Sequence, residues 1–185
     1  YKRQHLIFLA GMLSGFARVS VDSAIPGQPR WKKSVAVRGT YPIGRDESAS
    51  GKSVVNVAWM LAENLDGETV TLLEVAADAL VGSAAGPLRK ALIDSGLGED
   101  LSPATGMERD LRQVAFAVGL RGTDADRAGR IEALILAPTE RVAREGSERD
   151  LIEGALHQVA FHGREIARGA YPYGIALTGR AYPCL

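Results

Sequence analysis

The sequence has little of several features that would reveal its chemistry directly. Its one cysteine, Cys184, cannot form an internal disulfide, which favours a reducing compartment such as the cytoplasm. Lys and Arg balance Asp and Glu at 22 each, so no net charge attracts nucleic acid or anionic lipid. No apolar run reaches the roughly 18 residues of a membrane-spanning helix. These absences predict a soluble protein with neither nucleic acid nor a membrane as partner.

Catalytic signatures are also absent. There is no serine nucleophile elbow and no cysteine pair, so nucleophilic and thiol mechanisms have no support. His157, His162 and Glu165 lie on one predicted helix, but at about 100° per residue the two histidines diverge by ~140° and cannot close on one ion. We therefore assign no catalytic, cofactor-binding or metal-binding residue. The basic pairs are interpreted as surface charges at element ends: Arg89 with Lys90, and Arg109 with Arg112.

One segment, GRDESASGKS over residues 44–53, ends like a phosphate-binding loop. The motif requires a glycine five residues before Gly51, where this chain has Asp46, whose carboxylate repels phosphate. It also requires a helix afterwards, whereas the valines that follow predict a strand. The segment is therefore interpreted as a polar loop, and nucleotide binding is not expected.

The 185 residues are enough for one domain with a substantial core. Helical spacing predicts an amphipathic helix over residues 3–17, and its apolar face requires a covering partner. Proline and glycine mark residues 18–33 as a linker, and alternation around Val35 and Val37 predicts a short strand over 34–41. We expect this sequence to be a piece of a longer chain. The apolar face from Leu6 to Phe16 is then exposed in the isolated fragment, and we expect the fragment to self-associate through it.

The next elements are an apolar strand and a helix. Residues 53–62 are apolar on both faces, which predicts a central strand in which Asn56 needs a partner if buried. A helix over 69–81 follows and ends at Gly82. Its predicted buried stripe consists of Leu72, Leu73, Ala76, Ala79 and Leu80.

The best-formed unit lies between Pro87 and Gly122. Pro87 starts a short helix that runs to about Ser95, and a loop containing Pro103 and Gly106 follows. Residues 110–121 alternate cleanly and predict a strand with one large apolar face and one small face. The large face is formed by Val114, Phe116, Val118 and Leu120.

Helices dominate the remainder. One is predicted over 124–145, capped by Thr123 or Asp124 and kinked or broken at 134–138 because Pro138 lies inside it. Another is predicted over 148–168, opened by a capping box in SERD, residues 147–150, and residues 171–185 begin a further helix. Strands followed by pairs of helices predict an α+β fold with a mostly antiparallel sheet and helices on one face.

Three segments carry a resemblance to a known family. These are PLRKALIDSGLGED, DLRQVAFAVGLRGTDADRAGRIEALIL and ERDLIEGALHQVAFHGREIARGAYPYG. In order and spacing, over about residues 53–178, they resemble the second domain of presequence-protease-like zinc metallopeptidases of the pitrilysin and insulinase superfamily. Pro138 departs from the helix-forming residue expected there.

The resemblance implies one half of a metallopeptidase-like domain pair. Residues 1–33 would be the end of the catalytic domain and a linker, and residues 34–185 an inactive peptidase-like domain. It implies a non-catalytic, chamber-forming role, with unfolded peptides and the catalytic domain of the same chain as partners. Zinc, held by a His-x-x-Glu-His motif, is expected only in that catalytic domain. The alternative is a self-standing interaction or assembly subunit of the same fold without peptidase activity.

Overall fold

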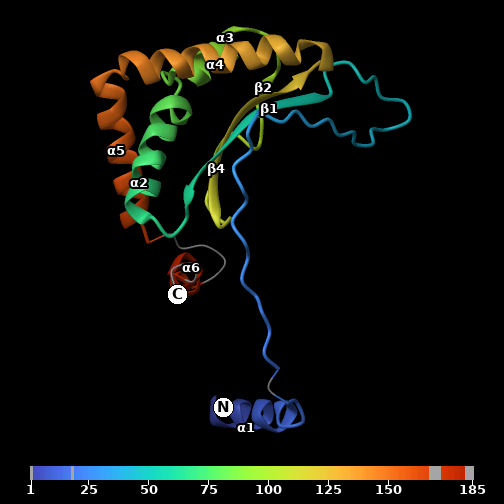
Figure 1. Cartoon of the computed structure of the whole chain (residues 1–185), viewed down its shortest axis with the longest axis vertical. Coiled ribbons are helices and arrows are strands. Elements are labelled where there is room, and N and C mark those ends of the chain that lie inside the picture. Colours follow the sequence, from blue (N-terminus) through green and yellow to red (C-terminus); the bar gives the residue numbers. More distant parts are fainter. Residues whose placement is uncertain (1, 18, 167–171, 182–185) are drawn as a thin grey trace.

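The computed structural model describes residues 2–17, 19–166 and 172–181 (Figure 1). A four-stranded antiparallel sheet has the order β1-β4-β2, and β3 also pairs with β4. The strands are β1 (Ser53–Glu63), β2 (Asp100–Leu101), β3 (Gly106–Glu108) and β4 (Gln113–Thr123). Helices pack on one face of this sheet, so the predicted α+β class is confirmed.

The helices of the described chain are α1 (Lys2–Leu13), α2 (Gly67–Ala77), α3 (Pro87–Asp94), α4 (Ala128–Glu145), α5 (Arg149–Arg164) and α6 (Tyr173–Ala181), with a π-helix η1 (Asp78–Gly82) and a 3₁₀-helix η2 (Ala125–Arg127). Helices α2 to α5 form the second layer of the fold. The stretch from Gly67 to Asp94 has the length and hydropathy of a membrane-spanning helix. In this fold it is divided into α2, η1 and α3, whose apolar residues contribute to the core.

Strand β4 is the centre of the sheet, and β1 lies at its edge. The residues Val114, Val118 and Leu120 of β4 are fully buried, which confirms the predicted alternation. Strand β1 pairs on one side with β4 and its other side meets no strand among the described residues, so the predicted central position of residues 53–62 is wrong. Both faces of β1 are apolar, but only the face toward the helices is covered.

The outer face of the sheet is lined by small residues on β4. Gly119 lies opposite Asn56 of β1, and a Cβ added to Gly119 would lie 2.0 Å from the Val55 carbonyl oxygen and 2.3 Å from the Asn56 side-chain oxygen. Glycine at position 119 therefore permits the close approach of the two strands. Asn56 is exposed to solvent, so it does not need the buried partner considered from the sequence.

The core lies between the sheet and helices α3 and α4. Leu88 and Leu92 of α3 and Ile131 and Ile135 of α4 are fully buried against the sheet. Burial of each such side chain contributes about 1.5–3 kcal/mol. On the sheet, the ring of Trp59 stacks on that of Phe116, with centroids 5.8 Å apart. Pro87 occupies the start of α3, as predicted.

The stretch from α2 through η1 buries only part of the predicted stripe: Ala79 is buried and Leu80 packs against the core, as predicted. Val70 and Ala77 are buried, whereas Leu72 is 65% exposed. The widened π turn of η1 then rotates the helix, so that Ala79 and Val81 are both buried. A π turn rotates the residues that follow it about the helix axis. A buried face predicted at 3.6 residues per turn therefore no longer matches the buried residues after the turn.

The predicted side-chain caps of the C-terminal helices are absent. Asp124 stands at the N-cap position of η2 and Glu148 at that of α5, but neither makes a capping hydrogen bond. Of the kink or break predicted at residues 134–138, the break is absent, because α4 continues through Pro138. Helix α6 confirms that a further helix begins after residue 171, although residues 182–185 lie outside the described part.

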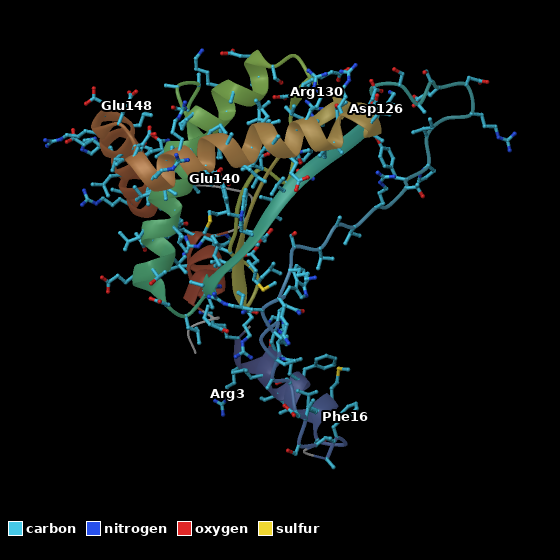
Figure 2. The ribbon with its side chains drawn as sticks, turned by 45° about the horizontal axis from the view of Figure 1, so that its top comes forward. Arg3, Phe16, Asp126, Arg130, Glu140 and Glu148 are labelled. Atoms are coloured by element: carbon cyan, nitrogen blue, oxygen red, sulfur yellow. The ribbon has the colours of Figure 1, made fainter. Side chains whose placement is uncertain are left out.

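The N-terminal part is a helix followed by a long extended segment. Helix α1 confirms that a helix lies near the N-terminus, but it ends at Leu13 and its apolar residues do not form the single face that was predicted. Residues 34–41 form no strand. The extended segment touches the sheet at two points: the Gln28 amide donates to the Gln113 side chain at 2.6 Å, and the Gly51 amide donates to Asp124 at 2.7 Å. Figure 2 shows Arg3 and Phe16 of the N-terminal part set apart from the sheet and its helices.

Candidate functional site

The described structure has an open cleft of about 840 Å³. It lies at the sheet edge opposite β1, between α2 and η1 on one side, the β2–β3 segment on another, and α5 on the third. We call it the η1 cleft. Its apolar wall comes from Ala77, Val81, Met107 and Val159, and its charged residues are Glu74, Asp78, Arg89, Asp100 and Arg109, with His162 at the α5 side.

Two of the acidic groups of the cleft have fixed partners. Glu74 of α2 forms an ion pair with Arg109, which joins the helix to the segment after β3. Asp100 accepts a hydrogen bond from the Leu101 amide at 2.7 Å and from Arg121 at 3.1 Å. These two bonds, together with the nearby charge of Arg89, hold the pKa of the Asp100 carboxyl below its ordinary value of 3.8. Asp100 is therefore ionised at neutral pH.

The third acidic group, Asp78, is placed differently. It begins η1 and is half-buried at the wall of the cleft. Its side chain folds over Gly82, where an added Cβ would lie 2.1 Å from one carboxylate oxygen. Among the described residues, no hydrogen bond or ion pair to the Asp78 carboxylate is found, so this charge remains available inside the cleft.

The β2–β3 segment forms a rigid rim of the cleft. The Ser102 amide donates to the Gly119 carbonyl at 2.9 Å, and the buried Ser102 hydroxyl accepts from the Ala104 amide at 3.1 Å. The Thr105 hydroxyl accepts from the Gly119 amide at 3.3 Å. The predicted loop between α3 and β4 is thus held against the central strand and gains two short strands.

Some of the histidines and arginines considered in the sequence analysis line the cleft, and others lie away from it. His162 lines it, whereas His157 is exposed elsewhere on α5 and Glu165 lies just after the helix. Within the described ranges, no group of three or more His, Cys, Asp or Glu side chains could hold a metal ion. Arg89 and Arg109, interpreted as surface charges, both line the cleft; Arg109 is exposed, as that interpretation expects, and Arg89 is half-buried. Sequence reasoning also missed Asp78, because no local pattern marks which helix face borders a cleft.

The segment that resembles a phosphate-binding loop has no such geometry. Gly51 adopts a φ of 67° and its amide is taken by Asp124, while Ser53 begins strand β1 instead of a helix. In a phosphate-binding loop, the backbone N–H groups at the N-terminus of the following helix point toward the phosphate. The structure therefore agrees with the interpretation of residues 44–53 as a polar loop.

Comparison with known proteins identifies relatives of one kind. The chain is 34% identical to presequence protease 1, chloroplastic/mitochondrial, of Arabidopsis thaliana over 157 residues, which are 84% of the chain and 14% of that relative. It is 30% identical to the mitochondrial presequence protease of Mus musculus over 93% of the chain and 16% of that relative. Protein HypA of Clostridium perfringens is 28% identical over 88% of the chain. The chain thus spans only a small part of these relatives.

Other comparisons concern fold and family. No family model matches the chain. A solved structure described as a zinc protease of Bordetella pertussis Tohama I is similar with a TM-score of 0.53 and 19% identity, over 70% of each chain, and this likeness shows the fold. Over most of its length the chain is thus similar to presequence proteases, and it has the fold of the Bordetella zinc protease, as expected of a protease-like domain.

Proposed function

We propose that this chain is a non-catalytic domain of a large zinc metalloendopeptidase, where it forms part of the wall of a chamber that encloses peptide substrates. The observation that carries the proposal is the extended match to presequence proteases, of which the chain spans 14% to 16%. A segment of that size is one part of a larger enzyme.

The histidines support the non-catalytic role. The sequence has three histidines, His5, His157 and His162. A glutamate, Glu165, lies three residues after His162, but Ile166 stands where a His-x-x-Glu-His motif requires its second histidine, and the other two histidines lack both residues. The described residues thus do not fit a zinc site, and we assign no catalytic step to them. Zinc, which makes a bound water nucleophilic at neutral pH, would belong to another domain of the parent chain.

Two surfaces support an enclosing role. The η1 cleft is an open cavity with both apolar and charged walls, which suits a peptide better than a small apolar ligand. The outer face of the sheet, with Met60 and Val54 at least two-fifths exposed, is a second apolar surface that a neighbouring domain or a peptide would cover.

Metal analysis and a peptidase assay on the purified chain test this proposal. We expect no stoichiometric zinc, no cleavage of an unstructured peptide, and measurable binding of that peptide without cleavage. One tightly held zinc per chain, or zinc-dependent cleavage, would contradict the non-catalytic role. Absence of peptide binding would contradict the enclosing role.

The reading frame on both sides of the segment tests the alternative. A His-x-x-Glu-His motif upstream in the same frame is expected if the chain is part of a peptidase. A stop codon upstream and an independent start at the segment would instead favour the self-standing assembly subunit.

A further inference from the structure

Strand β1 has an open edge with little to protect it. On the side away from β4, its backbone N–H and C=O groups pair with no strand among the described residues. The strand is 11 residues long, contains no proline or lysine, and has its one charged residue, Glu63, at its end. Long apolar edges of this kind pair with other chains unless the protein covers them.

The extended N-terminal segment is tied to the sheet at the end of β1. The Arg112 guanidinium donates a hydrogen bond to the Ile25 carbonyl and another, at 3.1 Å, to Glu63. The Gln28 amide donates to the side chain of Gln113, the residue of β4 that pairs with Glu63. This part of the segment is thus fixed beside the last residue of β1.

The same segment is tied again at the start of β1. The Tyr41 hydroxyl donates to the carbonyl of Lys52, which directly precedes the strand. Thirteen residue steps lead from Gln28 to Tyr41, and eleven lead from Lys52 to Glu63. The segment between the two ties is therefore long enough to follow β1 in an extended conformation, and it runs antiparallel to the strand. Figure 2 shows this segment, coloured blue to cyan, beside β1.

The side chains of the segment suit the open edge. The antiparallel register midway between the two ties places Val37 opposite Val55 and Val35 opposite Val57, and directly opposite side chains share one face of a sheet. Val55 and Val57 pack against the core, whereas Val35 and Val37 are 56% and 88% exposed. Pairing in this register moves both exposed valines onto the face that the helices cover, and a shift of one residue would turn them outward.

We propose that residues 34–40 are a strap that closes on the open edge of β1 by antiparallel backbone pairing. In the described structure the strap is open, since these residues form no strand, but both of its ties are made. Because the ties hold the strap beside the edge, closure costs little loop entropy. The closed strap satisfies the N–H and C=O groups of the edge and competes with strands of other chains for it. This device does not depend on the proposed peptide-enclosing function.

Amide hydrogen exchange of the whole 185-residue chain, followed by NMR, tests the strap. Alternate amides of β1 point away from β4, and only a second partner protects them. The test variants are Ala36→Pro and Val37→Pro, because neighbouring amides of a strand point to opposite sides and one of the two prolines removes a donor of the pairing. In that variant we expect these β1 amides to exchange at least about tenfold faster than in the wild type, as for an open state populated at about 10% or less in the wild type.

The control is Val21→Pro, which makes the same change in the extended segment before the first tie. It should leave the protection unchanged, and the amides bonded to β4 should keep their exchange rates in every variant. Outward β1 amides that exchange in the wild type as fast as in an unstructured peptide would overturn the proposal. Protection that survives both prolines, or that disappears on dilution, would also overturn it, because the strap would then not be the cover.

Discussion

At the scale of single residues, the fold of this domain depends on a few close contacts and hydrogen bonds made by individual side chains. Gly119 lets β1 lie against β4, and Asp124 uses its carboxylate to hold the Gly51 amide instead of capping a helix. Asp66 is the acidic residue that does cap one, since it accepts a hydrogen bond from the Thr69 amide at 3.2 Å before α2. Each of these roles depends on one small or acidic side chain and is open to a direct test.

Gly119→Ala should destabilise the domain, because its methyl group would lie 2.0 Å from the Val55 carbonyl oxygen. We expect a loss of about 1–3 kcal/mol in the free energy of unfolding, the usual cost of overpacking. The matched control is Gly154→Ala on α5, where nothing lies within 4 Å of the added Cβ. That change should stabilise the helix by up to ~1 kcal/mol. Urea unfolding measures both, and equal midpoints would contradict the close approach of the strands.

Asp66→Ala should lower stability at neutral pH and lose its effect in acid. The Thr69 side chain and, as the smaller effect, the Thr69 amide donate hydrogen bonds to the Asp66 carboxylate. These bonds hold the pKa of the Asp66 carboxyl below its ordinary value of 3.8. Because the folded pKa is lowered, the stabilisation is complete above 3.8 and is lost as the pH falls through the lowered pKa. Unfolding curves at several pH values measure it. Asp66→Asn, which keeps a capping oxygen, should remain close to wild type at neutral pH; a loss equal to that of Asp66→Ala would contradict capping.

At the scale of elements, several helices carry features that isolated helices avoid. Helix α4 continues through Pro138, and helix α2 passes into a π turn at Asp78. Both are tolerated because these helices bury apolar side chains in the fold: Ile131 and Ile135 of α4 and Ala77 of α2 belong to the core formed with the sheet. Tertiary packing supplies more of the stability of a helix in a protein than its intrinsic propensity does.

Pro138→Ala should therefore stabilise the domain. Proline removes one helical hydrogen bond and crowds the preceding turn, so its replacement is expected to raise the free energy of unfolding by up to about 3 kcal/mol. Pro87→Ala is the control, because Pro87 begins α3, where proline is well tolerated, and its replacement should change stability little. Thermal unfolding compares the two. A destabilised Pro138→Ala variant would mean that the helix requires the proline.

At the scale of the whole molecule, the described chain combines a packed body with apolar surface that nothing within it covers. Helix α1 has no buried residue, and Phe16 after it is 77% exposed. The outer edge of β1 is also open. That other parts of a larger protein cover these surfaces, and that the chain divides at residue 33, both remain predictions.

The isolated chain should self-associate through α1. Apolar residues lie on all sides of this helix, and those exposed by half or more include Leu6, Phe8 and Leu9. Light scattering should detect dimers or larger species at high concentration, and Leu6→Gln combined with Leu9→Gln should reduce them. Lys2→Gln, on the same helix, is the control that should leave association unchanged. A strict monomer at high concentration would contradict the prediction.

The longer helices and strands of this protein follow from the sequence, although the short strands β2 and β3 do not and residues 34–41 form no strand. Alternation located β4, Pro87 located the start of α3, and the apolar periods located α2, α4 and α5, because such patterns depend on neighbours along the chain. The family resemblance also follows from sequence order alone. These features together established the α+β class before any contact was known.

Only the tertiary structure decided which strand is central, which helix face is buried and which charges meet. Strand β1 is apolar on both faces whether it lies at the centre or at the edge, and η1 shifts the phase of α2 without a clear sequence signal. Asp78, Arg89 and Arg109 border one cleft although they come from three separate segments. Contacts between distant segments depend on how the layers pack, and a local pattern carries no information about that packing.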